Sequence, residues 1–188
     1  MKSEASLLDF GGKFYFKHFD SEGNLKGEGD MHNLFVDEGL VYALNTAFAL
    51  SIGGAPTPIS QFYVGLSTAN RTWLGGDNAS NVHVNSNEFT LYGSSYRPDW
   101  APQTLAIPGS IELSDDGHEA TFNIDDLSGV GGSAILYGGF IISANQKNGS
   151  GDSTATMLSG SNFSSPRELF SNDVFKIGYV LKAESGTI

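Results

Sequence analysis

The four histidines are the first candidates for metal chemistry, and their spacing argues against it. Zinc sites in proteins draw histidine or thiolate ligands from short, regular spacings. No two histidines of this chain form such a pair, and the sequence contains no cysteine. The sequence therefore predicts no metal site. The isolated histidines, expected on the surface or in turns, are His18, His32, His83 and His118.

Two pairs of adjacent aspartates, Asp115-Asp116 and Asp125-Asp126, are candidates for acid–base hydrolysis. Such hydrolysis needs two carboxyl groups that face each other across a cleft. Neighbouring acids in a turn instead cap the turn and stay hydrated. The chain also lacks a G-x-S-x-G sequence, and its glycine pairs do not fit the pattern of a phosphate-binding loop. We therefore expect no enzyme and no cofactor, and keep a β-sandwich hydrolase that uses Asp115 or Asp116 as a third hypothesis.

Aromatic residues in the expected loops could bind a carbohydrate. Trp73, Tyr96 and Trp100 could form a platform on which a sugar ring packs. The other interpretation is that these aromatic side chains fill the core of their own loop or a contact between subunits. The sequence leaves both interpretations open. Polar contacts to a sugar could come from Asp77, Asn78 and Asn81.

The elements that must position these residues are mostly strands, because apolar residues alternate along them. Phe14 and Phe16 share one face of segment 13–19, and four apolar residues share one face of the final strand at 174–182. The apolar segment 135–143 is expected to be a central strand covered on both faces. Further strands are expected at 25–29, 61–66, 88–92, 110–114, 119–124 and 154–158.

One helix and several connections complete the expected architecture. Apolar residues recur at helical spacing between Val36 and Phe48, which predicts a helix at about 36–50, with its inward face at positions 36, 40, 44, 47 and 48. The Asp115-Asp116-Gly117 sequence predicts a hairpin turn that pairs 110–114 with 119–124. Residues 67–87 are predicted to be a long polar loop, and residues 144–153 a flexible tip.

Composition supports a single β-rich domain. Glycine accounts for 24 of 188 residues and charged residues for 16%, so the chain is rich in turns and poor in exposed helix surface. We predict a mainly β, antiparallel β-sandwich or jelly-roll-like domain at 13–188, preceded by an N-terminal arm at 1–12. A low-charge surface is typical of a protein that buries much of itself against neighbours.

The net charge of the chain indicates which classes of partner are disfavoured. The 21 acidic residues exceed the 10 basic ones and give a net charge of −11, which disfavours nucleic acid and anionic membranes. The N-terminus lacks the apolar region of a signal peptide, and no apolar run is long enough to span a membrane. We therefore expect a protein that is made in a cytoplasm, or assembled there into something larger.

Several short motifs follow one another in order along residues 14–182. The helix start at 33–40 (NLFVDEGL) precedes a strand at 62–66 (FYVGL), the segment 97–100 (RPDW) and the last strand at 172–179 (NDVFKIGY). This order resembles a family of small tailed-bacteriophage virion proteins with N-L-V-x-x-x-G-L, W/F-Y-V/I-G-L, R-P/Q-x-W and G-D-x-L-K-I-x-Y motifs. Here the last motif has asparagine in place of its glycine, and the second begins with phenylalanine rather than tryptophan.

The resemblance implies a virion structural protein without catalytic residues, and we favour a capsid decoration (cement) protein. It would bind the major capsid protein on the outside of the head as a homo-oligomer, a trimer or dimer, after assembly in the host cytoplasm. The alternative is a tail- or fibre-associated virion protein with a glycan-binding adhesin role. The candidate partner contacts are Leu7, Leu8, Phe10, Trp73, Tyr96, Arg97 and Trp100. The first three belong to the N-terminal arm, which is expected to lack a strand partner.

Overall fold

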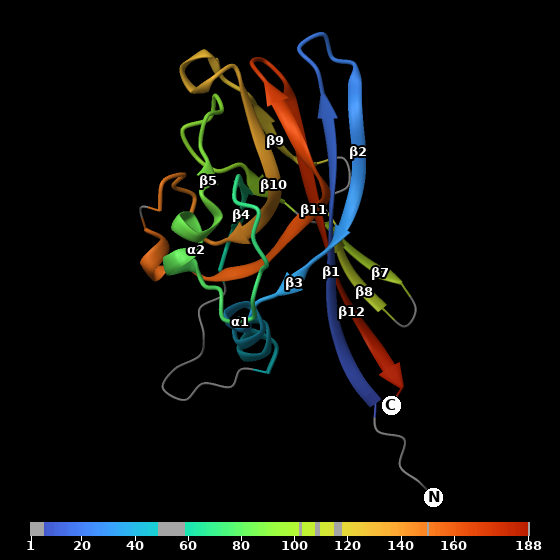
Figure 1. Ribbon diagram of the computed structural model, residues 1–188. Coiled ribbons are helices and arrows are strands. Elements are labelled where there is room, and N and C mark those ends of the chain that lie inside the picture. The colour runs from blue at the N-terminus through green and yellow to red at the C-terminus, as the bar shows by residue number, and fades with distance from the viewer. Residues whose placement is uncertain are drawn as a thin grey trace, which may run out of the picture.

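Two antiparallel six-stranded sheets, packed face to face, form the body of the protein (Figure 1). The computed structural model describes residues 6–48, 59–101, 103–107, 110–114, 118–149 and 151–187. The main hydrophobic core contains side chains from both sheets. The mainly β, antiparallel sandwich that the sequence predicts is therefore confirmed.

The first sheet is organised around its last strand, β12. Its strands are ordered β2-β1-β12-β8-β7, and β9 pairs with β12 as well. Phe14 lies opposite Tyr179 and Phe16 opposite Ile177, so alternate residues of β1 and β12 point into the core, as predicted. The strands are β1 Ser6–Phe19, β2 Leu25–His32, β7 Gln103–Ile107, β8 Ser110–Ser114, β9 Ala120–Asn123 and β12 Val174–Thr187.

The second sheet is centred on β10. Its strands are ordered β3-β11-β10-β4-β5, and β6 pairs with β4. Residues 138–142 of β10 lie between β4 and β11 and are buried, which confirms the predicted central strand for this part, whereas Ile135 at its start is 45% exposed. The strands are β3 Leu34–Phe35, β4 Phe62–Ser67, β5 Glu88–Phe89, β6 Asp99–Trp100, β10 Ser133–Ile142 and β11 Met157–Phe170.

Aromatic side chains hold the two sheets together. Phe163 of β11 lies 5.0 Å from Phe16 of β1 and 5.5 Å from Phe175 of β12, measured between ring centroids. Pairs at this separation add about 0.5–1.5 kcal/mol to the stability that burial alone provides. A smaller second core lies on the other face of the second sheet, which therefore carries a third layer. This core consists of Val36, Trp73, Ala79, Val82, Phe140, Ile142 and Met157.

Helix α1 (Asp37–Phe48) confirms the predicted helix but not its whole inward face. A Cβ atom on Gly39 would lie 2.3 Å from the carbonyl oxygen of Leu158, so this glycine allows the helix to approach the backbone of β11. The contact turns Leu40 and Ala43 toward the main core. Leu44, predicted to be inward, is 41% exposed instead.

Helix α2 (Ala79–Ser86) lies inside the segment predicted to be a long polar loop, so that prediction is wrong. Asn78 and Asn81 form a capping box at its start, and Asn87 ends it in a left-handed conformation with φ 45°. Val82 is fully buried in the second core. Two short 3-10 helices, η1 (Ser128–Val130) and η2 (Asp152–Thr154), complete the described helical structure.

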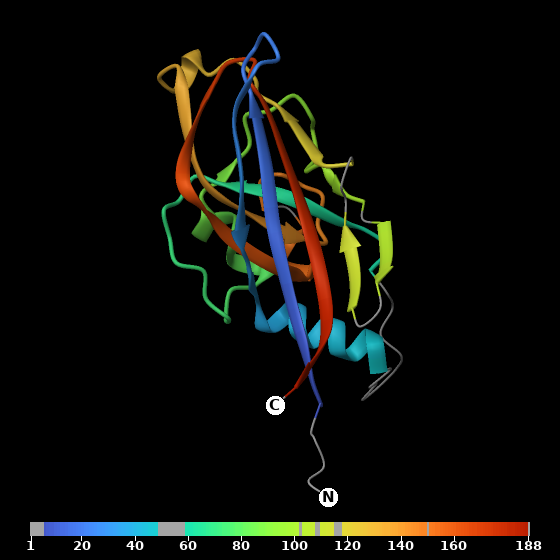
Figure 2. The same ribbon diagram turned by 90° about the vertical axis from the view of Figure 1, so that its right-hand side faces the viewer.

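Two predictions about pairing are also wrong. Residues 6–12 do not form an unpaired arm, because they continue β1 and pair with residues 181–187 of β12. Figure 2 shows β1 and β12 running side by side along the length of the molecule. Strands β8 and β9 do not form the predicted hairpin but pair with successive parts of β12, at 180–184 and 174–177. Residues 115–117 lie outside the described residues.

Candidate functional site

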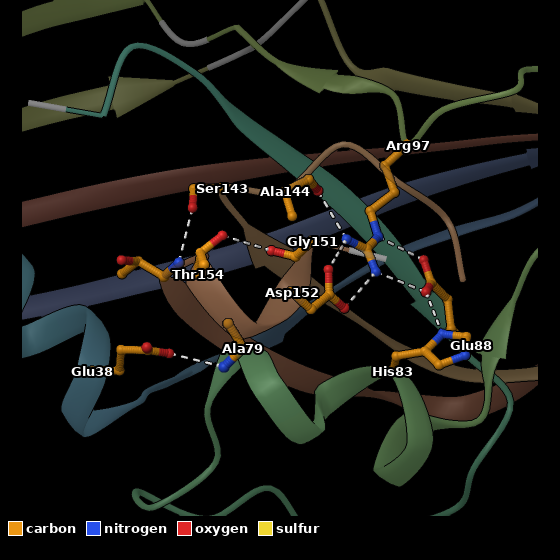
Figure 3. A network of polar contacts seen from close by, with 11 residues as sticks. Glu38, Ala79, His83, Glu88, Arg97, Ser143, Ala144, Gly151, Asp152 and Thr154 are labelled. Atoms are coloured by element: carbon orange, nitrogen blue, oxygen red, sulfur yellow. Dashed lines mark hydrogen bonds and ion pairs between the residues drawn. The ribbon is translucent and has the colours of Figure 1, made fainter. Parts of the chain in front are cut away.

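Arg97 is the centre of a buried network of charges in the outer layer (Figure 3). Its guanidinium nitrogens donate to both carboxylate oxygens of Glu88 at 2.7 and 2.8 Å, and to both of Asp152 at 2.9 and 3.1 Å. A fifth bond, of 2.8 Å, reaches the carbonyl oxygen of Ala144. A guanidinium group has five N–H donors, so all of them have a partner.

The ion pairs stabilise the charge of the arginine. Burial alone would lower the pKa of Arg97, but its hydrogen bonds to the carboxylates of Glu88 and Asp152 raise this pKa above its ordinary value. The side chains of Arg97 and Glu88 are completely buried, and that of Asp152 is 2% exposed. His83 Nδ1 lies 2.9 Å from Oε2 of Glu88, at the partly exposed edge of the network. Because no donor of Arg97 is left for a ligand, the network is a structural clamp.

The clamp joins segments that are distant in sequence. Glu88 belongs to β5, Asp152 to η2, and His83 to α2, while Arg97 precedes β6. Glu38 of α1 makes a second junction, since its Oε2 accepts the backbone N–H groups of Ala79 and Met157, each at 2.9 Å. Together these contacts fix the outer layer on the second sheet.

The predicted flexible tip at 144–153 is instead held in place by this network. Asp152 is 2% exposed and bound to Arg97, so the prediction of a flexible tip is wrong for this part of the segment. Of the weak strand predicted at 154–158, only residues 157 and 158 lie in a strand, at the start of β11, and Thr154 belongs to η2. Nothing in the local sequence of Asp152 indicated a buried role, because its partner is 55 positions away.

A polar groove of about 330 Å³ lies beside the clamp. Side chains of neutral residues surround it, and its wall includes the segment that the clamp fixes. Figure 3 shows four of these residues, Ser143, Ala144, Gly151 and Thr154, of which Ala144 is bonded to Arg97. The lining residues are Tyr63, Ser143, Ala144, Asn145, Gln146, Gly151, Thr154 and Ala155.

A second buried polar cluster ties the turn between β11 and β12 to β1 and β2. Asp173 Oδ2 lies 2.8 Å from His18 Nε2 and 2.8 Å from Lys26 Nζ, and accepts the backbone N–H of Phe170 at 2.9 Å. Burial is the main reason that the pKa of His18 is lowered, although its bond to Asp173 opposes this. Burial would raise the pKa of Asp173, but the bonds from Lys26, Phe170 and His18 lower it overall.

The histidines only partly match their prediction. His18 is 4% exposed and bonded to Asp173, so it is not a surface residue. His83 is paired with Glu88 in the clamp. Within the part of the chain that the structure describes, no three potential ligands gather in a way that could hold a metal ion.

The two tryptophans do not form an exposed sugar platform. Trp73 is 7% exposed, donates from Nε1 to Asn162 at 2.9 Å, and covers Gly160, where a Cβ atom would lie 2.4 Å from its ring. Trp100 is 4% exposed and donates to the carbonyl oxygen of Tyr179 at 3.1 Å. The interpretation that these aromatic side chains fill the protein's own core is the correct one.

The remaining candidate contacts fall in three environments. Tyr96 is 50% exposed and free to meet a partner, whereas Arg97 is buried in the clamp. Leu7, Leu8 and Phe10 lie in β1 with their backbones paired to β12, which corrects their placement in an unpaired arm. Asp77, Asn78 and Asn81 serve local structure, as a partner of Arg71 and as the cap of α2.

An exposed apolar surface, which the sequence did not single out, lies on the β10–β11 pair. Ile135 and Phe170 are each 45% exposed. Ile135 is opposite Glu168 and Ser133 is opposite Phe170, so the two apolar side chains are diagonal neighbours on one face. We call Ile135 and Phe170 the β10–β11 surface.

The fold and these clusters define an antiparallel β-sandwich with a helical outer layer fastened by buried ion pairs. Neither of the helices in the described part of the chain has the length and apolar character to cross a membrane. No protein-family model matches the chain, nor does any curated protein or any solved structure. Function therefore has to be inferred from the side chains and surfaces of this chain.

Proposed function

We propose that this protein is a bacteriophage capsid decoration protein that binds the outer surface of the head and stabilises it. The observation that carries the proposal is the β10–β11 surface, where Ile135 and Phe170 expose apolar side chains side by side. Large exposed apolar patches rimmed by polar residues mark protein-binding sites. The motif order at 33–40, 62–66, 97–100 and 172–179 supports a virion protein by its resemblance to that family.

The buried charges also fit a binding protein better than an enzyme. Arg97, Glu88 and Asp152 satisfy one another, and Asp173 is occupied by His18 and Lys26. A general acid or base needs access to substrate. Groups so enclosed instead give the outer layer a fixed shape, which a protein that docks on a repetitive surface requires.

Stabilisation would follow from mass action. A ligand that binds the assembled shell and not its free subunits shifts the equilibrium toward the shell, by about 4 kcal/mol per site at a thousandfold excess over its Kd. The major capsid protein is the proposed partner, and the chain would bind as a dimer or trimer at the symmetry positions of the head.

Immunogold electron microscopy of intact particles tests the location. The particles are purified from the host whose genome carries the gene, and are labelled with antibody raised against the chain. Gold spread over the head supports the decoration protein. Gold confined to the tail overturns it in favour of the tail- or fibre-associated alternative, and unlabelled particles overturn both.

Cosedimentation with these particles tests the proposed contact. The double variant Ile135→Ser with Phe170→Ser removes apolar area from the β10–β11 surface and is expected to bind at least tenfold more weakly. Val84→Ser is the control, because Val84 is 77% exposed on α2, outside this surface. Equal binding by the double variant and the control would show that the β10–β11 surface is not the contact.

A further inference from the structure

The groove beside the clamp presents polar side chains that the protein itself does not use. Tyr63, Asn145 and Gln146 line it, and no side-chain polar atom of these three makes a hydrogen bond to another described residue. Because these groups are in contact with solvent, leaving them without a protein hydrogen bond costs little free energy in the free protein. It also leaves an aromatic hydroxyl and two amides available to a ligand.

The chemistry of the lining selects the ligand. No charged side chain is among the eight lining residues, although the chain has 31 charged residues, 21 acidic and 10 basic. Asp152, next to the lining residue Gly151, is ion-paired with Arg97 in the clamp. Among the eight lining residues, an anion or a cation would find no counter-charge. A neutral ligand rich in hydroxyl groups would find amides that both donate and accept, and the ring of Tyr63 for its apolar face.

The wall of the groove is rigid, which favours binding. Arg97 donates its backbone N–H to the carbonyl oxygen of Asn145 at 2.7 Å and its side chain to that of Ala144 at 2.8 Å. Ser143 Oγ accepts the backbone N–H of Thr156 at 2.8 Å, and Thr154 Oγ1 donates to Gly151 at 3.2 Å (Figure 3). A preformed wall spares a ligand the entropy loss of ordering a loop.

The volume of the groove also fits a small-molecule binding site. Its volume of about 330 Å³ falls at the lower end of the roughly 300–1,000 Å³ range of small-molecule sites. Tyr96, which is 50% exposed, pairs through its backbone with Gln146 and extends the aromatic surface at this edge.

We infer that the groove lined by Tyr63, Asn145 and Gln146 is a binding site for a neutral saccharide. Arg97 is a positioning residue for this site, because it holds the wall without facing the ligand. The site is separate from Trp73 and Trp100, which are buried, and it does not depend on whether the protein decorates the head.

A glycan array carrying neutral and sialylated oligosaccharides is the first experiment, with the full-length chain as the probe. Binding to neutral glycans is the expected result. An array without any bound glycan, or with sialylated glycans alone, would overturn the inference.

Calorimetric titration with the strongest array ligand then assigns the site. Asn145→Ala and Gln146→Ala should each weaken binding at least tenfold, and Tyr63→Phe should weaken it less because the ring is kept. The control is Asn70→Ala, which removes an exposed amide outside the groove. Unchanged affinity in both amide variants would overturn the assignment. Their urea midpoints should equal that of the wild type, since neither side chain makes a hydrogen bond within the described residues.

Discussion

Arg97 is the residue on which the outer layer most depends. Its five hydrogen bonds reach two carboxylates and a carbonyl oxygen, on segments 9, 47 and 55 positions away. Two carboxylates and one guanidinium are thereby held out of water. Such groups are stable together, but each is expensive to leave alone in the interior.

Arg97→Leu is therefore expected to lower the free energy of unfolding by about 3–5 kcal/mol, because it leaves the carboxylates of Glu88 and Asp152 buried without a partner. Lys13→Met is the matched comparison. It removes the ion pair with Asp30, whose side chains are 47% and 61% exposed, and should change stability by less than about 1 kcal/mol. Urea denaturation measures both, and similar losses in the two variants would contradict the structural role of the clamp.

The cluster of His18 and Asp173 predicts a pH dependence of stability. The pKa of His18 is lowered by burial from the ordinary value of 6.5, so the unfolded chain binds this proton at a higher pH than the folded one. Stability from this group is complete above about pH 6.5 and is lost as the pH falls toward the lowered pKa of the folded state. The lowered pKa of Asp173 acts in the same direction, below its ordinary value of 3.8.

Urea midpoints measured between about pH 8 and pH 5 test this dependence. Wild-type protein should lose stability over this range, and His18→Gln should lose less because it cannot take up the proton. The difference between the two slopes isolates His18 from the other histidines. Parallel slopes would mean that His18 does not titrate differently in the folded and unfolded states.

At the scale of elements, α1 shows how one glycine sets the position of a helix. Gly39 lies against the backbone of Leu158, which is not a side chain that can turn away. Gly39→Ala should lower stability by about 1–3 kcal/mol through overpacking, even though alanine is the better helix former by about 1 kcal/mol.

Thr46→Ala on the exposed side of the same helix provides the control. It should raise stability by up to about 0.7 kcal/mol, because propensity acts there without a steric penalty. Thermal unfolding followed by circular dichroism distinguishes the two effects. A stabilised Gly39→Ala variant would contradict the close packing of α1 on β11.

The elements that the sequence predicts are those with regular apolar patterns. Alternation in β1 and β12 gave the correct inward faces, and helical spacing gave α1. Helix α2 was missed because its sequence, ASNVHVNS, is rich in asparagine and serine, which are poor helix formers. Contacts from elsewhere hold it, including the bond from Ala79 to Glu38.

Partners far apart in the sequence were the other source of error. The turn residues at 115–117 predicted a local hairpin, but β8 and β9 both pair with β12, some 50 to 70 positions later. The sequence predicts Arg97 as a partner contact, because nothing in the sequence around Glu88 or Asp152 indicates that these residues pair with it. Local patterns report which face a residue takes and not which distant segment covers it.

At the scale of the whole molecule, β12, the last strand, pairs both with the first strand and with strands from the middle of the chain. It pairs with β1 along 14 residues on one side, and with β8 and β9 on the other. The first sheet is therefore complete only when the last strand is in place. Folds dominated by such distant pairings fold slowly compared with helical ones of similar size.

Deleting residues 1–12 tests whether this segment is a dispensable arm or part of the sheet. The deletion removes the seven pairs between residues 6–12 and 181–187 but keeps Phe14 and Phe16 in the core. The shortened protein should still fold, with a lower urea midpoint. Because residues 181–187 would then lie at an open strand edge, it should also self-associate as its concentration rises.

Deletion of residues 1–5 alone is the matched control, since every pair of the β1–β12 ladder is kept. Light scattering coupled to size-exclusion chromatography, together with urea denaturation, compares the two shortened proteins with the full chain. If both behave like the full chain, the pairing of residues 6–12 contributes nothing to the sheet. If only the larger deletion loses stability and self-associates, the first sheet is damaged in that variant. Any loss of particle binding by this variant then reflects the damaged sheet. Contact with the capsid therefore has to be assigned from the variants of the β10–β11 surface.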